Sequence, residues 1–273
     1  NYQLDTALTA AADIGVTTTD LYSGPVSRWD DVNSVGVTLY SGALASLDDL
    51  SVLAGSNALA VENEHGQWEV LQFADASLTA PNTWMLSRLL RGQAGTEAAM
   101  RDPVTAGARV VVLNTALEQL ALPQNQYALP FHYLWGPQGR PISDSSYQSA
   151  ELAFEGVGMR PFAPCQLKAV YAGSGDLALS WIRRDRSPAS DSWDQTEIPM
   201  SETAESYDVE ILDSSGAVKR TYSSVATPSL DYAASDIAAD FPSGLPSPFR
   251  FTVYQLSSVV GRGTPKTASI FFA

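Results

Sequence analysis

Short strand-like runs, separated by turn residues, recur along the chain, and helical periodicity is nearly absent. Apolar residues that alternate with polar ones suit strands, whose side chains point to opposite faces, so the pattern predicts an all-β fold. The clearest pair is residues 57–62 and 67–73, which flank the turn sequence Asn63-Glu-His-Gly66. Because Asn and Gly tolerate positive φ, we expect these runs to form an antiparallel hairpin. Further strands of the first half are expected at residues 15–19, 35–40, 83–90 and 108–113.

The alternation becomes more regular after Pro164. Seven short strands in about 110 residues fit a seven-stranded Greek-key sandwich. Trp181 would share one strand face with Leu177 and Leu179, so we expect it to anchor the core between two sheets, opposite Tyr207. The expected strands are residues 166–171, 176–182, 205–212, 218–222, 229–232, 249–256 and 266–272.

The length of the chain, 273 residues, suffices for two domains that each bury their own core. The stretch 156–164 contains Pro and Gly and is a reasonable linker. We therefore expect an irregular β-rich domain at residues 1–158 and a β-sandwich at residues 159–273.

A connecting region of the first domain is interrupted by several prolines. One helical turn is expected at residues 117–120, before Pro123. Two aromatic-rich runs, 127–135 and 147–154, are expected to be strands, with an exposed turn at 136–141 between them.

The net charge of −14 argues against DNA or an anionic membrane as a partner, because binding to either depends on clustered Lys and Arg. Arg88 with Arg91, and Arg183 to Arg186, do cluster, but acidic residues lie near both groups, and we interpret them as solvated strand ends. No apolar run reaches the roughly 18 residues of a membrane-spanning helix. A signal-peptide pattern is not recognisable, and the chain begins without Met, so we expect a fragment of a longer protein.

No constellation of residues indicates a metal or cofactor site. The two histidines, His65 and His132, are far apart; we expect His65 to be solvated in its turn and His132 to be partly buried. The single cysteine, Cys165, excludes an internal disulfide and is expected to be a small buried apolar residue. Calcium-loop spacing is not shown by any of the three acidic groups, Asp30-Asp31, Asp48-Asp49 and Asp191-Ser-Trp-Asp194.

Catalytic patterns are missing as well. The sequence contains no G-x-S-x-G nucleophile elbow, and Gly173-Ser-Gly-Asp176 fits a tight turn and lacks the lysine of a phosphate-binding loop. We therefore expect no catalytic, cofactor-binding or metal-binding residues and no enzyme activity.

The segment from Trp84 to Met100 is the most distinctive motif of the chain. Apolar residues run up to an expected basic turn at Arg91, Gly92 and Gly95, and Thr96 is expected to cap a short helical turn. This arrangement, LLRGQAGTE followed by the strand ARVVVL, resembles the C-terminal region of the hub or host-specificity proteins of long-tailed phages. The version carried by gene transfer agents, the phage-like particles of alphaproteobacteria, is the most similar.

A second block supports the same resemblance. Arg160-Pro-Phe-Ala-Pro164, followed by the run Leu177-Ala-Leu-Ser-Trp-Ile-Arg-Arg184, looks like the fibronectin type III-like module that closes these proteins. The long polar loop 185–203 departs from that pattern and is a candidate contact loop.

The resemblance implies a structural role. The chain would be a virion component at the distal tail end, contributing to baseplate assembly and host cell-surface contact. Its partners would be other tail proteins, with three copies around one axis in the particle and a monomer as an isolated fragment. We expect neither direct nucleic-acid binding nor membrane insertion. The alternative is a carbohydrate-binding module, in which exposed Trp29, Trp135 or Trp193 would stack on a cell-surface glycan.

Overall fold

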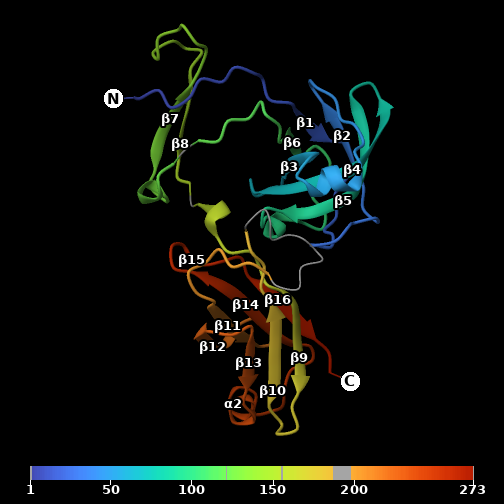
Figure 1. Ribbon diagram of the computed structural model, residues 1–273, viewed down its shortest axis with the longest axis vertical. Helices are drawn as coiled ribbons and strands as arrows, with labels where there is room; N and C mark the ends of the chain where they lie inside the picture. The colour runs from blue at the N-terminus through green and yellow to red at the C-terminus, as the bar shows by residue number, and fades with distance from the viewer. Residues whose placement is uncertain (1, 121, 155, 187–197, 273) are drawn as a thin grey trace. The chain divides into compact units, whose positions relative to one another are not determined.

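The computed structural model describes residues 2–120, 122–154, 156–186 and 198–272 (Figure 1). Strands make up nearly all of its regular structure, so the predicted all-β class is confirmed. The chain divides into two compact units, 1–157 and 158–273, and this division lies one residue from the expected boundary. Each unit is described separately below.

Six strands of the first unit close into a barrel with the order β1-β2-β5-β4-β3-β6. All neighbouring strands are antiparallel, and the pairing of β1 with β6 completes the ring. The expected β-rich first domain thus contains a closed barrel, which satisfies the edges that short strands would otherwise expose, and the irregular segments lie between and beyond its strands. The strands are β1 Ile14–Thr17, β2 Val35–Leu39, β3 Ala58–Glu62, β4 Trp68–Ala80, β5 Thr83–Gln93 and β6 Arg109–Val112.

Apolar side chains fill the barrel. Val37, Leu59, Leu71, Phe73 and Leu86 are among those that are fully buried. The predicted hairpin of β3 and β4 is confirmed, and Asn63 Oδ1 accepts hydrogen bonds from the backbone N–H groups of His65 and Gln67 in its turn.

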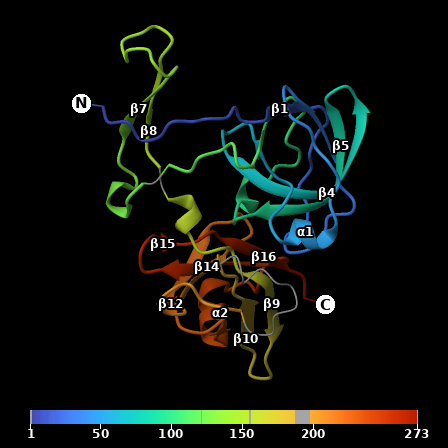
Figure 2. The ribbon, with the colours of Figure 1, turned by 45° about the horizontal axis from the view of Figure 1, so that its top comes forward.

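Several short elements accompany the barrel (Figure 2). The expected helical turn at 117–120 is wrong, because residues 117–120 have no regular structure. The chain turns earlier, at 114–117, where Asn114 Oδ1 accepts from the Ala116 N–H and the Asn114 carbonyl accepts from the Leu117 N–H. The two expected aromatic strands are confirmed over residues 131–135 and 148–152 and form a two-stranded ribbon. The elements are α1 Asp49–Leu53, the 3₁₀ turns η1 Glu97–Ala99, η2 Gln124–Gln126 and η3 Val157–Met159, and the ribbon strands β7 Phe131–Trp135 and β8 Gln148–Leu152.

Two sheets with a shared core form the second unit. One sheet has the order β13-β10-β9; the other has β12-β11-β14, with β15 and β16 both paired to β14. All seven expected strands are present, and Trp181, Leu177 and Leu179 lie in the core with Tyr207, as predicted. The strands are β9 Cys165–Tyr171, β10 Leu177–Ile182, β11 Tyr207–Leu212, β12 Val218–Val225, β13 Ser229–Tyr232, β14 Phe249–Ser257, β15 Gly261–Arg262 and β16 Lys266–Ile270.

A short helix, α2 Ala234–Asp240, follows β13 and was not predicted. Tertiary contacts hold it: Tyr232 Oη donates to Asp240 at 2.7 Å, and the Arg220 guanidinium contacts the same carboxylate at 2.6 and 3.0 Å. Burial and the hydrogen bond to Asp240 raise the pKa of Tyr232 above its usual value. Among the described residues, no helix has the length and apolar character needed to cross a membrane.

Candidate functional site

The distinctive motif lies within the barrel, where β5 continues through Arg91 and Gly92 to Gln93. The expected turn is therefore wrong at Arg91 and Gly92, while Gly95 does lie in the turn that follows β5. The interpretation of Arg91 as a solvated strand end is wrong as well. Its side chain is 0% exposed. Among the fully buried side chains of the described residues, that of Arg91 is the largest.

Two buried carboxylates neutralise this guanidinium. Arg91 Nε and Nη2 donate to the two carboxylate oxygens of Glu69 on β4, at 2.7 and 2.8 Å. Arg91 Nη1 donates to the Tyr22 carbonyl at 2.7 Å and to Asp30 Oδ2 at 3.3 Å. The Gly92 N–H also donates to Glu69, at 3.2 Å. These four residues, Arg91, Glu69, Asp30 and Tyr22, are called the Arg91 cluster below.

The Arg91 cluster fixes the segment between β1 and β2 to the barrel. Asp30 and Leu89 exchange two backbone hydrogen bonds, at 2.8 and 3.1 Å, and Val26 forms a bridge with Arg91 itself. Without the guanidinium, two carboxylates would stay buried with no counter-charge, which is unfavourable. The motif therefore carries a structural centre, and its charged groups are used in internal contacts.

Asp30 is held in its ionised form. Burial raises its pKa, but hydrogen bonds from Asn33 and Val32, and then the charge of Arg91, outweigh burial and lower the pKa below the usual value. Asn33 Nδ2 donates to Asp30 Oδ2 at 2.8 Å, and the Asn33 N–H donates to Oδ1 at 3.1 Å.

We expect this depressed pKa to make the first unit sensitive to acid. A lowered folded-state pKa contributes stability that is complete above the unfolded pKa, about 3.9, and is lost as the pH falls through the folded pKa. Urea unfolding between pH 7 and pH 2 should show that Asp30→Asn lowers stability at pH 7 but flattens its decline below about pH 4. Parallel profiles for both proteins would contradict this role of Asp30.

The end of the motif requires unusual backbone conformations. Gly92, Ala94 and Gly95 all have positive φ, at +58°, +54° and +75°. A Cβ on Gly92 would lie 2.9 Å from Glu97 Cα and Cβ and from Met100 Cε. The Thr96 side chain does not cap η1 as expected; its Oγ1 accepts from the Val70 N–H at 2.8 Å and donates to the Gln93 carbonyl at 2.7 Å.

Replacing Gly92 by Ala should destabilise the first unit, because the new Cβ adds both a backbone strain and a steric clash. Gly107→Ala is the matched control, since Gly107 has φ +92° but nothing within 4 Å of the added Cβ. We expect Gly92→Ala to cost about 2 kcal/mol or more, and Gly107→Ala about 1 kcal/mol, in urea unfolding. Equal costs at the two positions would show that only φ matters and that the clash with Glu97 is relieved.

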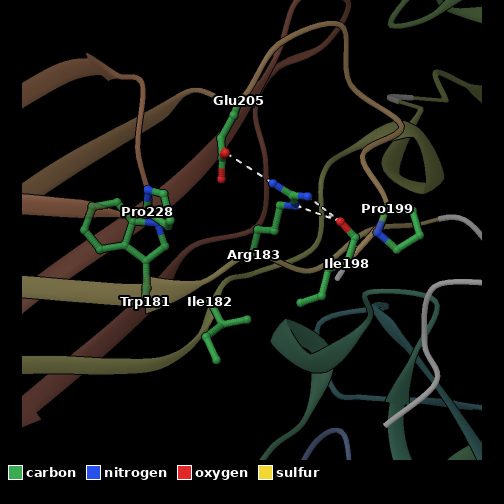
Figure 3. A pocket seen from close by; sticks show the side chains of 7 residues that line it. All are labelled: Trp181, Ile182, Arg183, Ile198, Pro199, Glu205 and Pro228. Atoms are coloured by element: carbon green, nitrogen blue, oxygen red, sulfur yellow. Dashed lines mark hydrogen bonds and ion pairs between the residues drawn. The ribbon is translucent and has the colours of Figure 1, made fainter. Parts of the chain in front are cut away.

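The second unit has an open hollow of about 580 Å³ beside β10 (Figure 3). The Arg183 side chain lies between Glu205 and Ile198 in Figure 3: its Nη1 is 3.2 Å from Glu205, and its Nε and Nη2 donate to the Ile198 carbonyl. Glu205 also accepts from Tyr207 Oη at 2.6 Å, and burial together with this bond raises the Tyr207 pKa. The remaining walls are Trp181, Ile182, Pro199 and Pro228.

The charged side chains of the hollow, Arg183 and Glu205, pair with each other beside apolar walls. The structure also corrects the prediction for the second basic group, Arg183 to Arg186. Arg184 is buried, with its guanidinium 5.2 Å from the Phe162 ring centre, and Arg186 is 3.2 Å from Glu202. The expectation that Arg183 to Arg186 are solvated strand ends is therefore wrong.

The histidines do not form a site together. His65 is exposed as predicted, 3.3 Å from Glu64. His132 was expected to be partly buried, but its side chain is 70% exposed and 3.2 Å from Glu151, because no further sheet covers that side of the ribbon in the described residues. Cys165 is partly buried at the start of β9.

The acidic groups serve local structure. Asp48 caps α1 by accepting from the Ser51 N–H, and Asp49 contacts Arg88 at 2.9 Å. No group of three or more metal-ligating side chains occurs in the part of the chain that the structure describes. Asp191, Asp194 and most of the expected contact loop 185–203 lie outside the described residues.

The three tryptophans considered for glycan stacking differ. Trp29 is half-buried, with the Arg88 guanidinium 5.0 Å above its ring, so its expected exposure is wrong. Trp135 is 52% exposed, as expected. Trp193 lies outside the described residues.

Comparisons with known proteins relate the barrel to one family. Residues 12–111, from just before β1 into β6, match the family model described as Rcc01698-like, C-terminal. No curated protein sequence matches the chain.

Two solved structures show weak likenesses. The extracellular domains d3-d4 of rat CD45 share 11% identity, with a TM-score of 0.28, over 59% of this chain and 72% of that one. The glycoside hydrolase domain of Endo-D from Streptococcus pneumoniae R6 shares 11% identity, with a TM-score of 0.23, over 96% of this chain and 36% of that one. We draw no conclusion from likenesses of this strength; the relationship that stands is the match of the barrel to the Rcc01698-like C-terminal model.

Proposed function

We propose that the chain is the C-terminal part of a tail-tip or baseplate hub in a phage-like particle of the gene transfer agent type. The match of residues 12–111 to the Rcc01698-like C-terminal model carries this proposal, since Rcc01698 is a gene name associated with gene transfer agents. The matched range contains the motif that resembles such hubs. It also contains nearly all of the barrel, to which β5 of the motif belongs.

The internal use of the motif supports a structural role. Arg91, Glu69 and Asp30 bind one another inside the unit, so the motif stabilises a rigid frame and offers no reactive group to a substrate. A rigid β-frame with exposed loops suits assembly and surface contact. The protein, on this proposal, has no enzyme activity of its own.

The location and partners follow from the same proposal. On this proposal the chain lies at the distal tail end, in contact with other tail proteins and with two further copies around the particle axis. Its net charge of −14 disfavours direct contact with DNA and, at low salt, self-association of the isolated chain. We therefore propose a monomer in dilute solution and a trimer in the particle.

Antibody labelling of intact particles tests the placement. Gold-conjugated antibodies raised against this chain should label one end of each tail in particles from cells that carry the gene. Antibodies against a capsid protein of the same particles are the control for labelling elsewhere. Labelling of capsids only, or of no particle at all, would overturn the proposal.

The second candidate, carbohydrate binding, is favoured by one observation, the exposed indole of Trp135. A glycan array with the wild-type chain and a Trp135→Ala variant tests it. Specific binding that the variant loses would support this second function; array binding that the variant retains would exclude Trp135 as its basis.

A further inference from the structure

The short helix α1 has one buried face and one exposed apolar face. It lies against β4 (Figure 2), and Val52 is fully buried there in a small cluster with Ala74 and Leu90. Leu50 and Leu53 are three positions apart, so they share one face of the helix. They are nevertheless 79% and 49% exposed, so the packing of α1 on the barrel does not bury these two leucines.

Two further exposed apolar residues lie close to α1. Leu47 lies two positions before the helix and is 39% exposed. Val32 is 92% exposed and follows Asp31 in the segment between β1 and β2. Arg88 joins this segment to α1, since its Nε is 3.7 Å from Asp31 and its Nη2 is 2.9 Å from Asp49. Exposed apolar residues that gather in one place mark interaction surfaces.

The carboxylates around these apolar residues outnumber the basic groups. The hydrogen bond from Arg88 to Asp49 outweighs desolvation and, with the charges of Asp49, Asp75 and Asp31, raises the pKa of Arg88. Asp48 adds a fourth negative charge at the start of α1. Among the described residues, Arg88 is the one Lys or Arg that forms an ion pair with any of these four acids. The surface called the α1 patch below consists of Asp31, Val32, Leu47, Asp48, Asp49, Leu50, Leu53, Asp75 and Arg88.

Charge selects the partner of this surface. The excess of carboxylates repels DNA, an anionic membrane and a second copy of the same acidic patch. It attracts Lys and Arg, while the exposed Leu and Val side chains favour apolar groups that cover them from water. An apolar stripe flanked by basic residues satisfies both requirements, and an amphipathic helix presents such a stripe.

We propose that the α1 patch binds a basic amphipathic segment of another protein. The apolar stripe of that segment covers Leu50 and Leu53, and its Lys or Arg side chains pair with the surrounding carboxylates. Among these acids, Arg88 donates a hydrogen bond to Asp49 alone, so Asp31 and Asp75 keep acceptor oxygens for the incoming cations. This inference goes beyond the proposed hub role and does not depend on it, because the position of the chain in a particle does not enter the argument.

A pair of synthetic peptides tests the chemistry of the partner. One helical peptide carries Leu on one face and Lys on the other, and the matched control has Glu in place of Lys. The full chain is titrated into each fluorescein-labelled peptide at moderate salt, and fluorescence anisotropy reports binding. We expect saturable binding of the Leu/Lys peptide that weakens as salt rises, and binding of the Leu/Glu peptide that is at least about tenfold weaker. Equal affinities, or no binding of the Leu/Lys peptide, would overturn the proposal.

Two matched leucine variants test whether the apolar part of the patch takes part. Leu50→Gln lies in the α1 patch, whereas Leu4→Gln changes a leucine of similar exposure, 81%, in the segment before β1. Both residues are exposed, so neither substitution should prevent folding. We expect Leu50→Gln to weaken binding of the Leu/Lys peptide about tenfold and Leu4→Gln to leave it unchanged. The same loss in both variants would overturn the proposal.

Two double variants with equal changes of charge test the acidic part. Asp31→Asn with Asp75→Asn removes two charges from the patch, and Asp5→Asn with Glu118→Gln removes two elsewhere. We expect the first pair to weaken binding about threefold or more and to reduce its salt dependence, with little effect of the second pair. Equal effects would show that net charge alone attracts the peptide, which contradicts the proposal.

Cross-linking locates the contact directly. A benzophenone group on the Leu face of the Leu/Lys peptide, activated by light, should attach within residues 29–33 or 44–53, as identified by mass spectrometry. Attachment elsewhere would overturn the proposal. Either result leaves the hub role untouched, because antibody labelling of particles tests the position of the chain and peptide binding tests this surface.

Discussion

Replacing Arg91 with Met should destabilise the first unit by about 3 to 5 kcal/mol, the usual cost of removing one member of a buried ion pair. Methionine fills much of the same space but leaves Glu69 and Asp30 without their counter-charge. Their side chains are 1% exposed, so water cannot replace the guanidinium without rearrangement of the segment between β1 and β2. Urea unfolding, followed by far-ultraviolet circular dichroism, measures the change.

Arg88→Met is the matched control, because Arg88 lies three positions earlier on the same strand. Its side chain is 40% exposed and contacts Asp49, so its loss should cost about 1 kcal/mol or less. The double variant Arg91→Met with Glu69→Met should recover part of the stability lost in Arg91→Met, since one unpaired acid disappears with its partner. If Arg91→Met and Arg88→Met cost the same, the Arg91 cluster is not a structural centre.

Trp181→Ala should destabilise the second unit by about 3 to 5 kcal/mol, the usual cost of truncating a large buried aromatic residue. The indole is 4% exposed and meets the Tyr207 ring edge to face, with 5.1 Å between ring centroids, so the substitution leaves a cavity between the two sheets. Ile182→Ala, at the next position and 39% exposed, is the control and should cost about 1 kcal/mol or less. The transition of the first unit should not move in either variant.

A Trp181→Ala cost near that of Ile182→Ala would mean that the sandwich core does not depend on Trp181. Equal losses in both units would show that the two units unfold together. Probes that report on each unit separately distinguish these outcomes, because the unfolding of the barrel can then be followed apart from that of the two-sheet unit in each variant.

Local patterns were sufficient to predict much of the fold. The β3–β4 hairpin follows from a turn sequence between two alternating runs, and the β10 core face follows from the spacing of Leu177, Leu179 and Trp181. Barrel closure could not be predicted in this way. It depends on the pairing of β1 with β6, which joins Ile14 to Val111 across the whole unit, and no local pattern specifies so distant a partner.

The burial of Arg91 is a second feature that local patterns could not predict. An arginine in a sequence is ordinarily a surface residue, and its burial here depends on Glu69 and Asp30, which lie 22 and 61 positions away. One signal was present, because Leu89 and Leu90 place Arg91 at the end of an apolar run that could have continued as a buried strand. Similarly, α2 is too short for a helical period to show, and contacts from Arg220 and Tyr232 hold it.

A three-dimensional reconstruction of the intact particle would test the proposed hub role at the level of residues. The proposal predicts density at the distal tail end, repeated three times around the axis, into which the six-stranded barrel and the two-sheet unit each fit as rigid bodies. A complete tail tip in which neither unit fits, or a fit only in the capsid or along the tail tube, would contradict it.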